Sequence, residues 1–385
     1  MSAVDKTNIP PGFTPEAWEE LEKSPLIKNM KSRRPSATSR LLERSRARCP
    51  EIVEKSSLKH YRWSYLKEGG KNGTTVEKLR FQTKQAVESK DEKCFSEIAF
   101  APEHLRFDVF EQNPKENVAA VTVIGGKTIN EDAFCTETIK FKGTTGHFFG
   151  VFDGHGDRGR CAGFVADALP SCIKELLSKA EKLNETIITD AITQAIGQLE
   201  KKWDGEGGTT ATCALKIEDH IYLINVGDSR TILVKKESVY SLTEDANPKE
   251  NRFERAVKKM GSFIVSNPEG TIHKVLGMCS VARDIGMEFL SAQPKLALLS
   301  AGKAEGKDLP EEGVLFYREG DYLVLASDGL WNDATTQEVG KAIQWMDSKG
   351  ATPNQMALAL VQETQDLRLG AHGGVDNVTV MVVKL

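Results

Sequence analysis

The stretch Phe148-Phe149-Gly150-Val151-Phe152-Asp153-Gly154-His155-Gly156 passes from an apolar run directly into an acidic, glycine-rich turn. The run is short and is bounded by aspartate and glycine, which predicts a buried β-strand. A carboxylate placed after such a strand lies at a tight turn, where glycine lets the backbone approach a ligand closely. One Asp-Gly pair after a strand indicates only a turn, so the rest of the chain has to decide its meaning.

Short β-branched runs of the same kind recur from about residue 117 onward. They predict further strands at 118–124, 210–217, 221–226, 231–235, 322–326 and 378–383. Long helical patterns lie between some of them, at 159–183, 185–203, 248–260, 335–349 and 352–369. Because the strands come in neighbouring clusters, we expect an α+β fold of antiparallel sheets covered by helices rather than a doubly wound parallel sheet.

Acidic residues stand at the ends of several predicted strands. In addition to Asp153, these are Glu131, Asp132, Asp228, Asp328 and Asp376. If they converge, the carboxylates cannot all stay ionised without a cation. Carboxylates and the Gly154 carbonyl are hard oxygen ligands, and no Cys/His cluster is present, which favours Mg²⁺ or Mn²⁺ over zinc or copper. Two such ions that share a bridging carboxylate could hold a hydroxide for in-line attack on phosphorus.

The composition is that of a soluble globular protein and excludes several classes. The chain has 385 residues, 39% hydrophobic and 28% charged, with a formal net charge of −4. A general nucleic-acid binder would carry a strong basic excess, so we expect no specific nucleic-acid partner. No apolar run approaches the roughly 18 residues of a transmembrane helix. The seven cysteines lack CxxC spacing, which indicates reduced thiols in a cytoplasmic or nuclear protein without disulfides or a zinc site.

The small net charge conceals an asymmetry between two parts of the chain. Residues 1–100 carry a net charge of +6 and the remainder carries −10. The segment 28–48 alone holds eight basic residues and one acid, with few large apolar residues, so we expect it to be disordered when alone. It is either a solvated tail or a docking arm for a partner, a weak nuclear-import signal or a membrane-surface patch.

Eight segments of the chain follow the order of motifs in one known family. They are residues 127–132, 149–156, 208–211, 225–230, 242–250, 280–286, 325–331 and 376–380. Each is weak alone, but the ordered set is specific, and residues 117–385 resemble the metal-dependent protein serine/threonine phosphatases of type 2C. We therefore expect a catalytic domain at 117–385, preceded by a basic N-terminal extension at 1–116.

The resemblance implies a four-layer α-β-β-α sandwich, in which helices flank two central antiparallel sheets. It also implies hydrolysis of phosphoserine and phosphothreonine in phosphoprotein substrates by a metal-activated water, and we expect a monomer. Its metal ligands would be Asp153 bridging two ions, Asp328 and Asp376 on the first, the Gly154 carbonyl with Glu131 and Asp132 on the second, and Asp228 on a weaker third. His155 would be the general acid that protonates the leaving alkoxide, a suitable task for imidazole near neutral pH.

The chain departs from the family pattern at several positions. Lys127 replaces the usual arginine that grips the substrate phosphate; lysine keeps the charge but loses the bidentate fork, so we expect weaker phosphate binding. Met287 stands where an aspartate often follows Gly286, and residues 261–313, expected to form a flap and loops beside the site, fit least well. Two hypotheses stay open: an active phosphatase, or a pseudophosphatase that serves as an interaction module on the same fold. The carboxylates at the ligand positions are intact, which favours the enzyme.

Overall fold

A computed structural model of the chain describes residues 107–112, 117–125, 127, 129–267, 273–302, 315–370 and 376–385. The predicted basic segment 28–48, and with it most of the predicted N-terminal extension, lies outside the described residues. Within the described residues, no helix is both long and apolar enough to cross a membrane.

The first central sheet has six strands, and all its pairings are antiparallel. In spatial order the strands are β1 (Phe107–Gln112), β2 (Val118–Val123), β16 (Val378–Lys384), β15 (Tyr322–Ala326), β9 (Arg230–Val234) and β10 (Val239–Ser241). Its outer face packs against α9 (Asp328–Trp331), α10 (Thr336–Asp347) and α11 (Pro353–Gly370). The helix α10 begins in a capping box, in which Thr335 and Glu338 satisfy each other's backbone amides.

The second central sheet also has six strands. Their order is β14 (Phe316–Tyr317), β13 (Lys295–Ala301), β8 (His220–Val226), β7 (Ala211–Ile217), β4 (Thr144–Phe152) and β3 (Ala133–Phe141). The pairing of β13 with β14 is parallel, whereas the other pairings of this sheet are antiparallel. Helices α6 (Arg160–Lys179) and α7 (Glu185–Lys202) cover its outer face, where apolar residues of both helices are fully buried.

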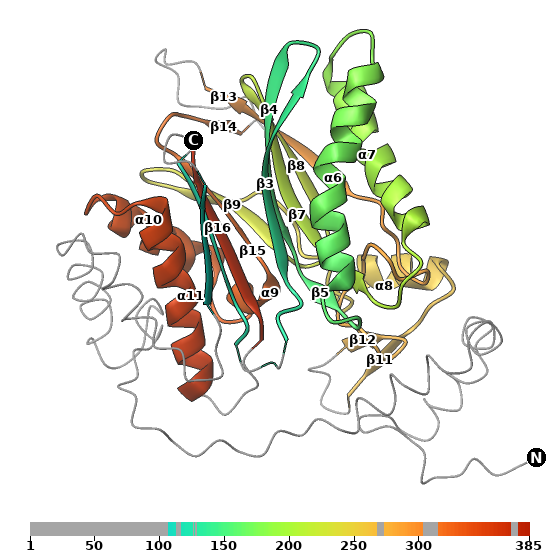
Figure 1. Cartoon of the computed structure of the whole chain (residues 1–385). Helices are drawn as coiled ribbons and strands as arrows, with labels where there is room; N and C mark the ends of the chain where they lie inside the picture. Colours follow the sequence, from blue (N-terminus) through green and yellow to red (C-terminus); the bar gives the residue numbers. More distant parts are fainter. Residues whose placement is uncertain are drawn as a thin grey trace, which may run out of the picture.

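The two sheets pack face to face and enclose a shared core. It contains Phe149 and Val151 of β4, Leu323 and Leu325 of β15, and Met381 of β16. Figure 1 shows the resulting layers, with α10 and α11 outside one sheet and α6 and α7 outside the other. This is the predicted α+β fold and the predicted four-layer arrangement, because each sheet buries its inner face against the other and its outer face against helices.

Smaller elements lie beside one end of the sandwich. The β4 strand runs into the short strand β5 (Gly154–His155), which pairs with β6 (Gly208–Thr209) after α7. Helix α8 (Asn251–Lys259) and the hairpin of β11 (Ile264–Ser266) and β12 (His273–Val275) share a separate apolar cluster with Phe289 and Leu290. Figure 1 places these elements next to β5.

Two predicted boundaries need correction. The catalytic domain was predicted to begin at residue 117. The strand β1 precedes this residue, yet it pairs with β2 along its whole length, so the first sheet already begins at Phe107. The strand β13 lies inside the segment 261–313, which we expected to form a flap, but it pairs with β8 in the central sheet. The partner of β1 is the next strand along the chain, whereas β13 pairs with a strand much earlier in the sequence. Both strands carry polar residues within or at the ends of their apolar stretches, so their own residues do not predict a buried strand.

Candidate active site

Three aspartates from the ends of three strands meet at one edge of the sandwich. Asp153 follows β4, Asp228 follows β8 after one glycine, and Asp328 follows β15 after one serine. One carboxylate oxygen from each lies within 4.8 Å of the corresponding oxygens of the other two. The strands come from both sheets, so the face-to-face packing of the sheets is what brings the acids together.

The electrostatics of this group are unfavourable without a cation. Burial raises the pKa of Asp153 well above its ordinary value, and repulsion from Asp328 and Asp132 adds to the effect. Burial and repulsion from Asp328 raise the pKa of Asp228 in the same way. The Oδ1 atom of Asp228 is buried without a hydrogen-bond partner among the described residues. An orphaned carboxylate oxygen among three converging carboxylates fits a hard divalent cation.

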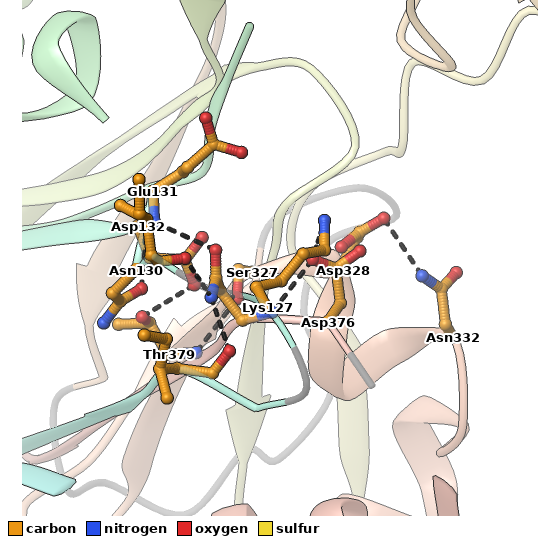
Figure 2. Close-up of polar contacts among 12 residues, drawn as sticks. Lys127, Asn130, Glu131, Asp132, Ser327, Asp328, Asn332, Asp376 and Thr379 are labelled. Carbon is orange, nitrogen blue, oxygen red and sulfur yellow. Dashed lines mark hydrogen bonds and ion pairs between the residues drawn. The ribbon is translucent and has the colours of Figure 1, made fainter. Parts of the chain in front are cut away.

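Asp132 lies apart from this group, in a network of hydroxyl groups. Its Oδ2 atom accepts hydrogen bonds from the Ser327 hydroxyl at 2.8 Å and from the Thr379 hydroxyl at 2.7 Å. Figure 2 shows Asp132 between these two side chains. The Thr379 hydroxyl in turn lies 2.7 Å from that of Thr122, so the network joins β2, β16 and the residue after β15. Burial raises the pKa of Asp132 to about 7. The carboxylate is thus fixed beside the site by hydroxyl donors.

Glu131 connects the loop after β2 with the turn after β4. Its carbonyl oxygen accepts a hydrogen bond from the Gly154 amide at 3.2 Å, and its carboxylate accepts one from the Arg158 amide at 2.9 Å. A Cβ atom at position 154 would overlap the Glu131 carbonyl oxygen, so only glycine allows this close approach. The turn after Asp153 is therefore fixed against the loop that carries Glu131.

Asp376 forms an ion pair with Lys127 and is not part of the group of three. Its Oδ1 atom lies 2.7 Å from the Lys127 ammonium (Figure 2). Although burial opposes the charge of Lys127, the Asp376 carboxylate raises the pKa of the ammonium above its ordinary value. Lys127 is thus a charged donor at the edge of the acidic site, already bonded to one of its carboxylates.

His155 contacts a buried aspartate that the sequence reasoning assigned no role. The His155 Nε2 atom lies 2.5 Å from the Asp284 Oδ2 atom, and Asp284 is fully buried. The Met287 amide donates to the other Asp284 oxygen at 2.8 Å, and a Cβ atom at position 208 would overlap this carboxylate. Burial lowers the pKa of His155, but the charge of Asp284 and its hydrogen bond raise this pKa by a larger amount, so the net shift is upward. The signal in the sequence was an acid that follows Arg283 within the segment 281–286.

A cavity of about 650 Å³ contains most of the predicted site residues. Its lining includes the three aspartates of the group together with Lys127, Glu131, Gly154, His155 and Asp376. Asp132 does not line it, which agrees with its hydroxyl network. The cavity also extends to a second wall, formed by residues 203–207, 278–281 and 286–289. The last two stretches lie in the segment 261–313 that was expected beside the site, whereas no role was predicted for residues 203–207.

Comparison with known proteins places this chain among the protein phosphatases. The chain belongs to the protein phosphatase 2C family, whose sequence model matches residues 127–369. Protein phosphatase 1L of Bos taurus is 28% identical over 284 residues, which cover 70% of this chain and 72% of that protein. The probable protein phosphatase 2C 59 of Oryza sativa subsp. japonica is 28% identical over 285 residues, which cover 71% of this chain and 77% of that protein.

Solved structures with the same fold include two that cover most of the chain. The serine-threonine phosphatase 2C from Toxoplasma gondii superposes with a TM-score of 0.52 at 19% identity, covering 69% of this chain and 94% of that one. A C. elegans sex determining protein gives a TM-score of 0.53 at 18% identity, covering 74% of this chain and 65% of that one. At these identities the likeness concerns the fold.

Proposed function

We propose that this chain is a metal-dependent protein serine/threonine phosphatase that uses Mg²⁺ or Mn²⁺ to hydrolyse phosphoserine and phosphothreonine in proteins. The observation that carries the proposal is the convergence of three aspartates from two sheets, with oxygens within 4.8 Å of one another. Membership of the protein phosphatase 2C family supports the same conclusion.

The residues that would hold the cations are those of the acidic edge. Asp153, Asp228 and Asp328 would be the carboxylate ligands, and the Gly154 carbonyl and Asp376 lie in the same cavity. Glu131 and Asp132 would act directly or through water; the hydroxyl network of Asp132 favours water. When bound, divalent cations would supply Lewis acidity toward water and the phosphoryl group.

The remaining residues position the substrate and its proton. The Lys127 ammonium is a cation of the cavity lining and would contact the phosphate, in exchange for or in addition to its bond with Asp376. His155 would hold the proton that the leaving serine or threonine oxygen takes up. Because its Nε2 atom faces Asp284, the Nδ1 atom is the nitrogen left to donate that proton.

The test is release of inorganic phosphate from a phosphothreonine peptide by the full-length chain. Release should require Mn²⁺ or Mg²⁺, stop after EDTA is added, and disappear in the Asp153→Asn variant. If the wild-type chain released no more phosphate than Asp153→Asn at any metal concentration, the proposal would be wrong, and the chain would serve as an interaction module on this fold.

A further inference from the structure

The cavity extends well beyond the acids that would bind metal. Besides Asp153, His155 and Gly156, it is lined by a wall formed by residues 203–207, after α7, and by residues 278–281 and 286–289, after β12. A phosphorylated side chain whose phosphate lies at the three aspartates would place its own backbone and its neighbouring residues along this wall. The wall is therefore where residues beside the phosphorylated one would be recognised.

Part of the wall is apolar, and its Trp203 side chain is held in place by neighbouring residues. Its apolar side chains are Trp203, Met278, Val281, Met287 and Phe289. The Trp203 indole donates a hydrogen bond to the Gly207 carbonyl at 3.3 Å. The centroids of the Trp203 and Phe164 rings lie 5.4 Å apart. These contacts hold the indole in place, so it offers a preformed aromatic surface for an aliphatic stem or a guanidinium group.

The rim of the same wall is acidic, and no Lys or Arg side chain of the described residues lines it. Asp204, Glu206 and Glu288 line this part of the cavity, and none forms an ion pair with a described residue. Lys127 is the one Lys or Arg among the described residues that line the cavity, and it is paired with Asp376. Glu200, behind the wall, has its pKa raised to about 6 by burial, with Asp284 and Glu288 adding repulsion. The acids of the rim are different residues from the three grouped aspartates whose charge bound cations would neutralise.

We propose that this wall is a specificity subsite that selects phosphorylated segments with a basic residue, preferably arginine, next to the phosphoserine or phosphothreonine. The inference rests on the proposed phosphatase function. An arginine can lay its stem and planar guanidinium on the Trp203 indole while it reaches the unpaired carboxylates of the rim. An acidic flanking residue would meet like charges and would be rejected.

The experiment compares three phosphothreonine peptides that differ only in the flanking residues, which are arginine, glutamine or glutamate. The full-length chain with Mn²⁺ should show a kcat/KM about tenfold higher for the arginine peptide than for the glutamine peptide, and lowest for the glutamate peptide. Salt at 0.5 M should reduce these ratios, because the rim charges are exposed to solvent. Equal kcat/KM for all three peptides would overturn the inference and leave the phosphatase function standing.

Variants locate the effect at the wall. In the triple variant Asp204→Asn, Glu206→Gln, Glu288→Gln, the ratio between the arginine and glutamine peptides should fall to near one. The matched control is Asp190→Asn, Glu181→Gln, Glu237→Gln, which removes three exposed acids outside the cavity and should keep the wild-type ratio. A wild-type ratio in the first variant would overturn the inference. If the wild-type chain hydrolysed neither these peptides nor p-nitrophenyl phosphate, the proposed function itself would fail, and this inference with it.

Discussion

Replacing Asp153 by asparagine should stabilise the metal-free protein while it abolishes activity. Two unit charges 4.8 Å apart repel by about 3.5 kcal/mol at an effective dielectric constant of about 20. Asp153 has two such neighbours, Asp228 and Asp328, and no described residue donates a hydrogen bond to its carboxylate. Burial and this repulsion raise the pKa values of Asp153 and Asp228, and water that enters the cavity screens the charges, so we expect a net gain of about 2 kcal/mol.

The assay is thermal or urea unfolding at pH 7.5, with EDTA and then with Mn²⁺. In EDTA, Asp153→Asn should unfold about 4–8 °C above wild type, given about 2–4 °C per kcal/mol for a domain of this size. Added Mn²⁺ should stabilise wild type, by about 2.7 kcal/mol at one hundred times the dissociation constant, and should have little effect on the variant.

The control for this prediction is Asp167→Asn, the same substitution at an exposed position of α6 outside the cavity. It should leave the melting temperature unchanged in EDTA and should keep the response to Mn²⁺. If Asp153→Asn were less stable than wild type in EDTA, or responded to Mn²⁺ as wild type does, the argument from converging carboxylates would be refuted.

The Lys127→Ala variant loses the 2.7 Å ion pair with Asp376 and a cation that lines the cavity. The KM for p-nitrophenyl phosphate should therefore rise about tenfold. An unchanged KM would show that Lys127 does not contact the phosphate. Asp284→Asn should lower the pKa of His155, measured by NMR titration of the metal-free protein, because Asp284 outweighs the effect of burial; an unshifted resonance would contradict this. Asp132, whose pKa burial raises to about 7, binds its proton more tightly in the folded chain than in the unfolded one. The free energy of unfolding of the metal-free protein should therefore fall as pH rises from about 4 to about 7 and then level off, and urea titrations that found it rising would refute the assignment.

Much of the fold could be predicted because it depends on local pattern. Runs such as 148–152 and 322–326 are apolar throughout and end abruptly at Asp-Gly or Ser-Asp-Gly, so they predict both a buried strand and an acid at its end. The helices at 160–179 and 185–202 carry apolar residues at helical spacing, and the second begins at an asparagine N-cap. The strands β1 and β13 escaped prediction because their pairing partners, rather than their own residues, hold them in the sheets.

By itself, the sequence determined which acids follow strands, and the ordered motifs indicated the family. The tertiary structure decided which of those acids meet. It groups Asp153, Asp228 and Asp328, bonds Asp132 to Thr379 across 247 positions of the chain, and places Asp284 against His155. Each of these contacts joins separate strands or loops. The distances between these side chains depend on how the two twisted sheets pack on each other. The residues next to each side chain in the sequence do not determine that packing.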